Sequence, residues 1–164
     1  VIESNIILEI SKKNLIHNYK FFNKLKKNNI CAVTIKSNGY GLGAEKIYQL
    51  LLKNNCKHFF VATTKEGVNL RKKFSKGNIY IFNGLEFNEL NVFKKYNLIP
   101  ILSNIKDYIK IVKASIKYGI QIDTGINRLG IKYEDYKKLN FKDNNLKIII
   151  SHLASGDERK NKYN

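Results

Sequence analysis

The stretch Ile30-Cys-Ala-Val-Thr-Ile-Lys-Ser-Asn-Gly-Tyr-Gly-Leu-Gly43 joins an apolar run to a glycine-rich segment, with a single lysine between them. The apolar part is typical of a buried strand, and Lys36 stands at its carboxyl end. An amphipathic segment that places Ile47, Leu50 and Leu51 on one face follows the glycines. Strand, turn and helix in this order predict a β/α unit.

The same alternation continues along the chain. We predict strands, each a nearly continuous apolar run, at residues 6–10, 30–35, 58–62, 79–82, 98–101, 120–122 and 146–151. Helices are expected between them, among them segments 86–95 and 133–140. Continuous apolar strands separated by helices are typical of a parallel sheet that is covered on both faces.

Several residues predict where helices begin and end. Ser11 can cap the first helix, and Thr63 with Glu66 forms a capping box for a later one. A further helix is expected to begin after Ser103 or Asn104 and to end at Gly119. Its predicted inward face consists of Ile105, Ile109, Val112 and Ile116.

Two architectures fit this pattern. One is an open, doubly wound α/β sheet, and the other is a (β/α)8 barrel. A complete barrel needs roughly 250 residues, and the chain has 164. The chain would therefore be a barrel fragment of about six strands or a complete open sheet, and periodicity alone does not choose between them.

Composition excludes some functions. The net charge of +17 favours nucleic-acid binding, but only Arg71, Arg128 and Arg159 are arginines and the lysines are scattered, so we expect no specific nucleic-acid site. No apolar run is long enough to span a membrane. Cys31 and Cys56 form no CxxC pair and no metal-ligand spacing with a histidine, so no metal site is predicted.

Polar residues with useful chemistry follow three of the predicted strands. Lys36 follows one, the segment 123–130 with Arg128 follows another, and His152 follows the last. The carboxyl ends of parallel strands meet at one edge, so an amine, a guanidinium and an imidazole would converge there. A lysine amine can form a Schiff base with a carbonyl, an arginine can bind an oxyanion, and a histidine can transfer protons.

Each of these residues also has an ordinary structural explanation. Lys36 would fit a salt bridge at the rim, Arg128 would fit a pair with Asp123, and His152 would fit a core position with its hydrogen bonds satisfied. The run GYGLG matches neither the dinucleotide fingerprint GxGxxG nor a P-loop, so nucleotide binding is not predicted.

Three segments together resemble the signatures of one family. The segments AVTIKSNGYGLGAEKI, IDTGINRLGI and SHLASGDE closely resemble the N-terminal barrel of alanine racemases, and LIHNYKFF and EGVNLR fit in the same order. The resemblance implies a pyridoxal 5′-phosphate enzyme that interconverts L- and D-alanine as a cytoplasmic homodimer and supplies D-alanine for peptidoglycan. It also favours the barrel over the open sheet.

The resemblance divides the chain into two parts. Residues 1–10 would be an N-terminal strand that packs with a missing C-terminal β domain. Residues 11–164 would be a partial cofactor-binding barrel. The remainder of the barrel would lie outside this chain, so the chain alone is expected to be inactive.

The resemblance also implies roles for four residues. Lys36 would form the Schiff base with the cofactor and act as one of two catalytic bases, the other being a tyrosine of a second subunit. Tyr40 would bind the cofactor phosphate, and Arg128 would donate to its phenolic oxygen. His152 would pack against the pyridine ring.

Three positions depart from the family pattern. Gln121 stands where many members have a carbamylated lysine that orients the arginine, and Ser37 and Gly39 stand where alanine is commoner. Two alternatives remain: a racemase of another small amino acid such as serine, and a noncatalytic barrel protein that holds pyridoxal phosphate.

Overall fold

In the part of the chain that the structure describes, six parallel strands form one sheet in the order of the chain. The structure, a computed structural model, describes residues 6–25, 30–85, 89–158 and 160–162. The strands are β1 (Val33–Thr34), β2 (His58–Val61), β3 (Asn78–Ile81), β4 (Ile99–Leu102), β5 (Tyr118–Ile122) and β6 (Leu146–Ser151). Each pairs in parallel with the next, from β1 to β6. A doubly wound sheet would reverse this order at a switch point, so the sheet is part of a barrel, as expected.

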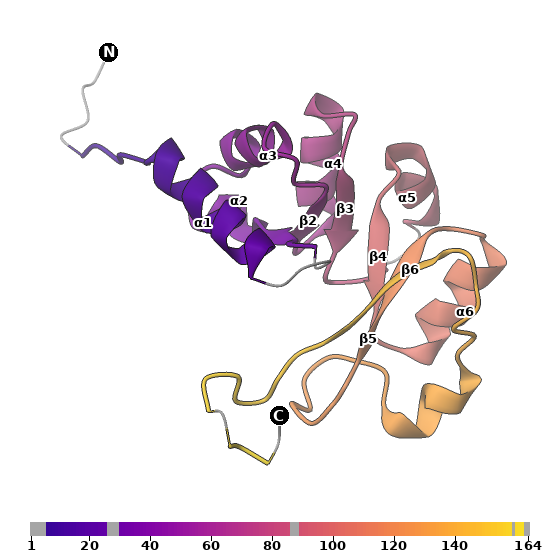
Figure 1. Cartoon of the computed structure of the whole chain (residues 1–164). Coiled ribbons are helices and arrows are strands. Elements are labelled where there is room, and N and C mark those ends of the chain that lie inside the picture. Colours follow the sequence, from indigo (N-terminus) through magenta and orange to yellow (C-terminus); the bar gives the residue numbers. More distant parts are fainter. Residues whose placement is uncertain (1–5, 26–29, 86–88, 159, 163–164) are drawn as a thin grey trace.

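Helices precede the first strand and connect most of the others (Figure 1). The helix before β1 is α1 (Lys12–Lys24). The connections contain α2 (Lys36–Tyr40), α3 (Ala44–Leu52), α4 (Thr64–Lys73), α5 (Leu90–Tyr96), α6 (Ile105–Lys113) and the 3₁₀ helix η1 (Tyr133–Lys138). The segment predicted as a helix at 133–140 is therefore a shorter 3₁₀ helix. Residues 86–88 of the helix predicted at 86–95 lie outside the described residues.

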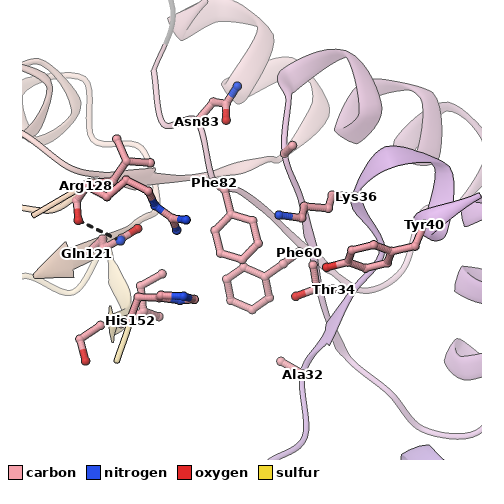
Figure 2. Close-up of a pocket in the computed structure, with 14 residues that line it drawn as sticks. Ala32, Thr34, Lys36, Tyr40, Phe60, Phe82, Asn83, Gln121, Arg128 and His152 are labelled. Atoms are coloured by element: carbon pink, nitrogen blue, oxygen red, sulfur yellow. Dashed lines mark hydrogen bonds between the residues drawn. The ribbon is translucent and has the colours of Figure 1, made fainter. Parts of the chain in front are cut away.

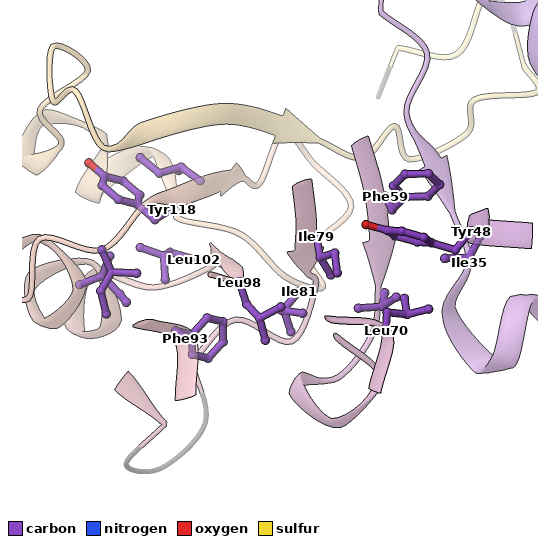
Figure 3. Packing of buried hydrophobic residues seen from close by; sticks show 14 of the residues in the cluster. Ile35, Tyr48, Phe59, Leu70, Ile79, Ile81, Phe93, Leu98, Leu102 and Tyr118 are labelled. Carbon is purple, nitrogen blue, oxygen red and sulfur yellow. The ribbon is translucent and has the colours of Figure 1, made fainter. Parts of the chain in front are cut away.

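The sheet separates two apolar clusters. Phe59, Ile79 and Ile81 belong to the larger cluster, on the helix side of the sheet, in which the ring centroids of Phe59 and Tyr48 of α3 lie 4.0 Å apart (Figure 3). Phe60 and Tyr80, one position along, belong to the opposite cluster on the inner face of the half-barrel. Successive strand residues point to opposite faces of the sheet. Because both faces are apolar, each strand is a nearly continuous apolar run in the sequence.

The predicted helix starts at Ser11 and Asn104 are confirmed, and so is the capping box. Ser11 accepts from the amide of Asn14 at 3.2 Å, and Asn104 accepts from the amide of Asp107 at 2.9 Å. Thr63 and Glu66 bond reciprocally at the start of α4. Short polar side chains in these positions satisfy amide groups that have no partner within the helix.

The end predicted for the helix after Asn104 is wrong. α6 ends at Lys113, and Gly119 lies within β5. A Cβ atom on Gly119 would come within 2.6 Å of side-chain atoms of Ile101 and Ile148. The glycine therefore allows close packing beside neighbouring strands instead of terminating a helix.

The predicted inward face of the same helix is correct for two of its four residues. Ile116 is buried and Ile105 packs against the core. Ile109 and Val112, however, are 47% and 37% exposed, and Tyr108 and Ile111 are buried in their place.

Tyr108 holds the inward position because its ring packs edge-on against Tyr118 and its hydroxyl accepts from the amide of Asn140 at 2.9 Å. The Tyr108 hydroxyl thus has a hydrogen-bond partner inside the core. The spacing of apolar residues alone does not predict such a position for a tyrosine.

The strand predicted at 6–10 does not form. These residues adopt no regular structure, and Ile6 is 86% exposed. Apolar residues are not sufficient, because a strand is defined by a ladder of bonds to a neighbouring strand, and the sheet of the described residues begins at β1. Packing of this segment against a further domain stays a prediction.

Candidate functional site

Lys36 is followed by one turn of left-handed backbone. Ser37, Asn38, Gly39 and Tyr40 have φ values of 52°, 55°, 65° and 55°. Only one of the four is a glycine, and left-handed helical geometry costs an L-residue roughly 1–2 kcal/mol. The turn is therefore a strained segment that its surroundings must hold in place.

Local hydrogen bonds hold most of this turn. The amide of Gly39 donates to the Ile35 carbonyl at 2.9 Å, and the amide of Gly43 donates to the Asn38 carbonyl at 2.8 Å. The Asn38 side-chain oxygen also accepts from the amide of Ala44 at 3.0 Å, at the start of α3. The asparagine thus links the left-handed turn to the right-handed helix after it.

The four predicted site residues line one cavity at the carboxyl ends of the strands. The cavity has a volume of about 520 Å³ and includes Lys36, Tyr40, Arg128 and His152 in its lining. Figure 2 shows Lys36 and Tyr40 on one side and Arg128 and His152 on the other, with the rings of Phe60 and Phe82 between them. The expected convergence of an amine, a guanidinium and an imidazole is therefore present in the fold.

The loop that carries Arg128 is closed by its own residues. Asp123 accepts with one carboxylate oxygen from the amides of Gly125 at 3.0 Å and Asn127 at 3.1 Å. The Asp123 amide donates to the Ile131 carbonyl at 3.1 Å. The Asp123 carboxylate thus binds backbone amides of its own loop. Among the described residues it forms no ion pair with Arg128.

Gln121 supports this loop from below. Its side chain is 5% exposed, and its amide nitrogen donates to the Leu129 carbonyl at 3.0 Å. The bond reaches the residue next to Arg128 and not the guanidinium itself. Gln121 therefore stabilises the path of the backbone beside Arg128.

Several lining residues were not predicted from the sequence. Phe60 and Phe82 stack with ring centroids 4.9 Å apart, and Tyr80 stacks on Phe60 at 4.6 Å. The signal was the alternation of strand residues, which assigns Phe60 to the inner face once β2 is placed in a barrel. The rings of Phe60 and Phe82 give the cavity an apolar floor.

A histidine and a tyrosine are paired next to these rings. The ring nitrogen Nδ1 of His58 lies 2.9 Å from the Tyr80 hydroxyl. Burial lowers the pKa of His58, and the nearby Lys57 lowers it further; burial raises the pKa of Tyr80. Both groups therefore favour their neutral forms.

The chemistry of the lining groups fits pyridoxal phosphate. The cofactor offers an aldehyde, a phenolic oxygen, a phosphate and an aromatic ring, and the cavity offers an amine, a guanidinium, a tyrosine hydroxyl and an imidazole. The described residues contain no cluster of three or more His, Cys, Asp or Glu side chains suited to a metal ion. None of their helices combines the length and apolar character needed to cross a membrane.

Comparisons with known proteins agree with this geometry. Residues 10–164 match the family described as alanine racemase, N-terminal domain. The alanine racemase of Rickettsia akari is 36% identical over 96% of this chain, which spans 48% of that protein. The chain thus covers about half the length of the curated relatives it matches.

Solved structures show the same fold. Alanine racemase from Bartonella henselae, whose structure contains covalently bound pyridoxal phosphate, superposes with a TM-score of 0.80 at 29% identity, covering 93% of this chain and 48% of its own. A histidine racemase from Leuconostoc mesenteroides superposes with a TM-score of 0.76 at 17% identity, covering 93% of this chain and 44% of its own. The second likeness concerns the fold alone.

Proposed function

Because the chain belongs to the alanine racemase family, whose N-terminal domain it matches, we propose that the protein containing it is a pyridoxal-phosphate-dependent racemase that interconverts L- and D-alanine. The activity is that of the complete protein, since this chain covers about half of its relatives. We further propose that the complete protein is a cytoplasmic homodimer that supplies D-alanine for peptidoglycan.

The observation that carries the proposal is the convergence of Lys36, Arg128 and His152 on one cavity. They follow β1, β5 and β6, so only a curved parallel sheet brings them together. Tyr40 adds a hydroxyl to the lysine side of the same cavity (Figure 2). The arrangement supports a site that binds an anionic aromatic aldehyde together with an amino acid substrate.

Pyridoxal phosphate, when bound, withdraws electrons from an attached amino acid and so acidifies its Cα proton. In our proposal the Nζ atom of Lys36 would hold the cofactor until the amino group of the substrate replaces it there. The freed amine would then accept or return that proton on one face of Cα. The opposite face is served by a group outside this chain, a tyrosine of the second subunit. Transfer on opposite faces inverts the Cα centre.

The other three residues orient the cofactor. The Arg128 guanidinium would donate to the phenolic oxygen, and the Tyr40 hydroxyl would bind the phosphate. The His152 imidazole would pack against the ring, and the apolar floor of Phe60 and Phe82, which also line the cavity, would limit water below it. Gln121 acts through the backbone of the arginine loop.

The test uses the full-length product of the gene that encodes this chain. The protein is mixed with pyridoxal phosphate, reduced with borohydride and digested, and the pyridoxyl adduct is located by peptide mass spectrometry. We expect the adduct on Lys36, together with racemisation of alanine followed by chiral chromatography. Serine, assayed in parallel, tests the closest alternative substrate.

Two variants make this test specific. Lys36→Arg keeps a positive charge but cannot form the Schiff base, so both adduct and turnover should be lost. Lys106→Ala removes an exposed lysine of α6 and should change neither. A folded wild-type protein without an adduct on Lys36, or a Lys36→Arg variant that still racemises alanine, would refute the assignment. An adduct without racemisation of either amino acid would favour the noncatalytic alternative.

A further inference from the structure

Glu66 bonds two separate parts of the chain. One carboxylate oxygen, Oε2, accepts from the amides of Ala62 at 2.8 Å and Thr63 at 3.1 Å, which completes the cap of α4. The other oxygen, Oε1, accepts from the amide of Ser37 at 2.6 Å, a contact across 29 positions of sequence. A helix cap requires only the first set of bonds, so the second calls for its own explanation.

The Ser37 amide belongs to the peptide group that directly follows Lys36. The peptide group on the other side of Lys36 is also held, because the Ile35 carbonyl accepts from the amide of Gly39 at 2.9 Å. Both peptide planes that flank the lysine Cα are therefore fixed, one locally and one by Glu66. Fixing these planes fixes the direction in which the lysine side chain leaves the backbone.

The bond lies at the start of a strained segment of backbone. Ser37 is the first residue of the left-handed turn, with φ 52° and ψ 49°. A strained conformation persists only where the surrounding contacts over-determine it. A hydrogen bond to an ionised carboxylate is stronger than one to a neutral acceptor, so Glu66 is well suited to hold this turn.

We propose that Glu66 is a positioning residue for Lys36: its carboxylate couples the left-handed turn to the start of α4 and so holds the lysine in the direction of the cavity. The inference rests on the proposed function, because it assigns to Glu66 an effect on cofactor capture by Lys36. Glu66 does not appear among the residues that line the cavity. Its action is therefore through the backbone of residues 36 and 37.

The isosteric variant Glu66→Gln separates the two sets of bonds. A glutamine has one acceptor oxygen, so it can face either the two cap amides or Ser37, and its NH₂ group then meets the other donor. Keeping two bonds is favoured over keeping one, so Ser37 is the partner expected to be lost. Thr63→Ala is the matched control, because it removes the Thr63 Oγ1 acceptor of the Glu66 amide (3.3 Å) and leaves the contact with Ser37.

The experiment compares these variants in the full-length protein by two measurements. The first is amide hydrogen exchange of residues 36–43 and 64–73 without cofactor. The second is the pyridoxal phosphate concentration at which half of Lys36 is trapped by borohydride. For Glu66→Gln we expect exchange of 36–43 and the half-saturating concentration each to rise about tenfold, the scale of one lost charge-assisted hydrogen bond.

The control should show the opposite pattern. Thr63→Ala should accelerate exchange at the start of 64–73 and leave both 36–43 and the half-saturating concentration unchanged. The inference is overturned if Glu66→Gln leaves 36–43 unchanged, or if the two variants weaken trapping equally at equal thermal stability. If Glu66→Gln does not fold, Glu66→Asp replaces it, since the shorter side chain cannot span both sets of amides. A wild-type protein that traps no cofactor on Lys36 refutes the proposed function itself, which the wild-type sample alone reveals.

Discussion

The two sides of the cavity are held in different ways. On the lysine side, a left-handed turn is tied to α4 by Glu66, a residue 29 positions away from its partner Ser37. On the arginine side, the loop after β5 is closed by Asp123 and by Gln121, and these contacts span at most eight positions. The lysine side therefore depends on the packing of another β/α unit, whereas the arginine side depends on its own sequence.

This difference has a physical basis in the type of strain. Three residues with side chains, Ser37, Asn38 and Tyr40, have positive φ on the lysine side, so external contacts must offset the cost. The arginine loop places Asn127 and two glycines in such conformations, which lowers that cost. A substitution in the arginine loop should therefore change that loop alone, whereas a substitution on the lysine side should also affect the β/α unit that holds the turn.

The largest expected effect comes from breaking the arginine loop at Gly130. Its φ is 134°, and an added Cβ would lie 2.4 Å from the backbone nitrogen of Asp123, which cannot move without opening the loop. Gly130→Ala should lower the free energy of unfolding by about 3 kcal/mol, measured by urea denaturation. Gly41→Ala is the control, because its φ is 87° but no atom lies within 4 Å. Equal losses for both variants would contradict the role of the close approach.

The second-largest effect should come from alkaline pH, which should lower the free energy of unfolding through Tyr48 on the lysine side. Tyr48 of α3 is fully buried and donates to the Lys76 carbonyl at 2.6 Å. Burial raises the pKa of Tyr48 to about 12. Because the unfolded pKa is about 10, the neutral tyrosine contributes stability in full below pH 10, and up to about 2 kcal/mol is lost as pH rises to 12.

Urea denaturation between pH 9 and 12 checks this expectation. Tyr48→Phe should flatten part of the decline, and only part, since burial also raises the pKa of Tyr19 to about 12. Tyr133→Phe changes a ring that is 81% exposed and should leave the profile unaltered. A Tyr48→Phe profile that is parallel to the wild-type profile would show that this hydroxyl does not set the alkaline limit.

A smaller effect is expected from Gln121→Leu. The change leaves the Leu129 carbonyl without its side-chain donor, at a cost of about 1–2 kcal/mol in unfolding free energy. Hydrogen exchange should increase within 123–131 and not within 36–43. Gln49→Leu, at an exposed position of α3, serves as the control. Faster exchange on the lysine side as well would mean that the two sides are coupled.

The smallest expected effect is that of Gly39→Ala. The added Cβ would lie 2.8 Å from Cδ1 of Ile47, the mobile end of a side chain, so the cost should be about 1 kcal/mol. Combining the change with Ile47→Val removes that atom, and the pair should lose less than the sum of the single variants. Strict additivity in thermal denaturation would show that the contact with Ile47 does not contribute to the cost.

Local signals in the sequence predicted much of the fold. The capping box of Thr63 and Glu66 was recognisable because two short-range bonds fix the spacing of the two residues. The strands were recognisable because both faces of the sheet are apolar. Gly119 was misassigned because a glycine after a helix resembles a cap, whereas its role depends on Ile101 and Ile148 of the neighbouring strands.

The residues of the site could be predicted from the sequence, but the contacts that hold them in place could not. Lys36, Arg128 and His152 follow strands, so the rule that strand ends gather at one edge brought them together. No sequence rule predicts a left-handed turn through Ser37 and Asn38, and the Glu66 carboxylate reaches Ser37 only in the folded chain. Contacts of this kind belong to tertiary structure, where local propensity carries no information.

The left-handed turn also bears on the chemical ageing of the protein. Asparagine followed by glycine is the sequence most prone to deamidation, because the next backbone nitrogen attacks the side-chain amide and closes a ring; asparagine is accordingly a thermolabile residue. In Asn38-Gly39 both reactants are engaged, since the Gly39 amide donates to Ile35 and the Asn38 oxygen accepts from Ala44. The folded turn should therefore protect Asn38. A one-dalton mass gain at this position would record how often the turn has opened during the lifetime of the molecule.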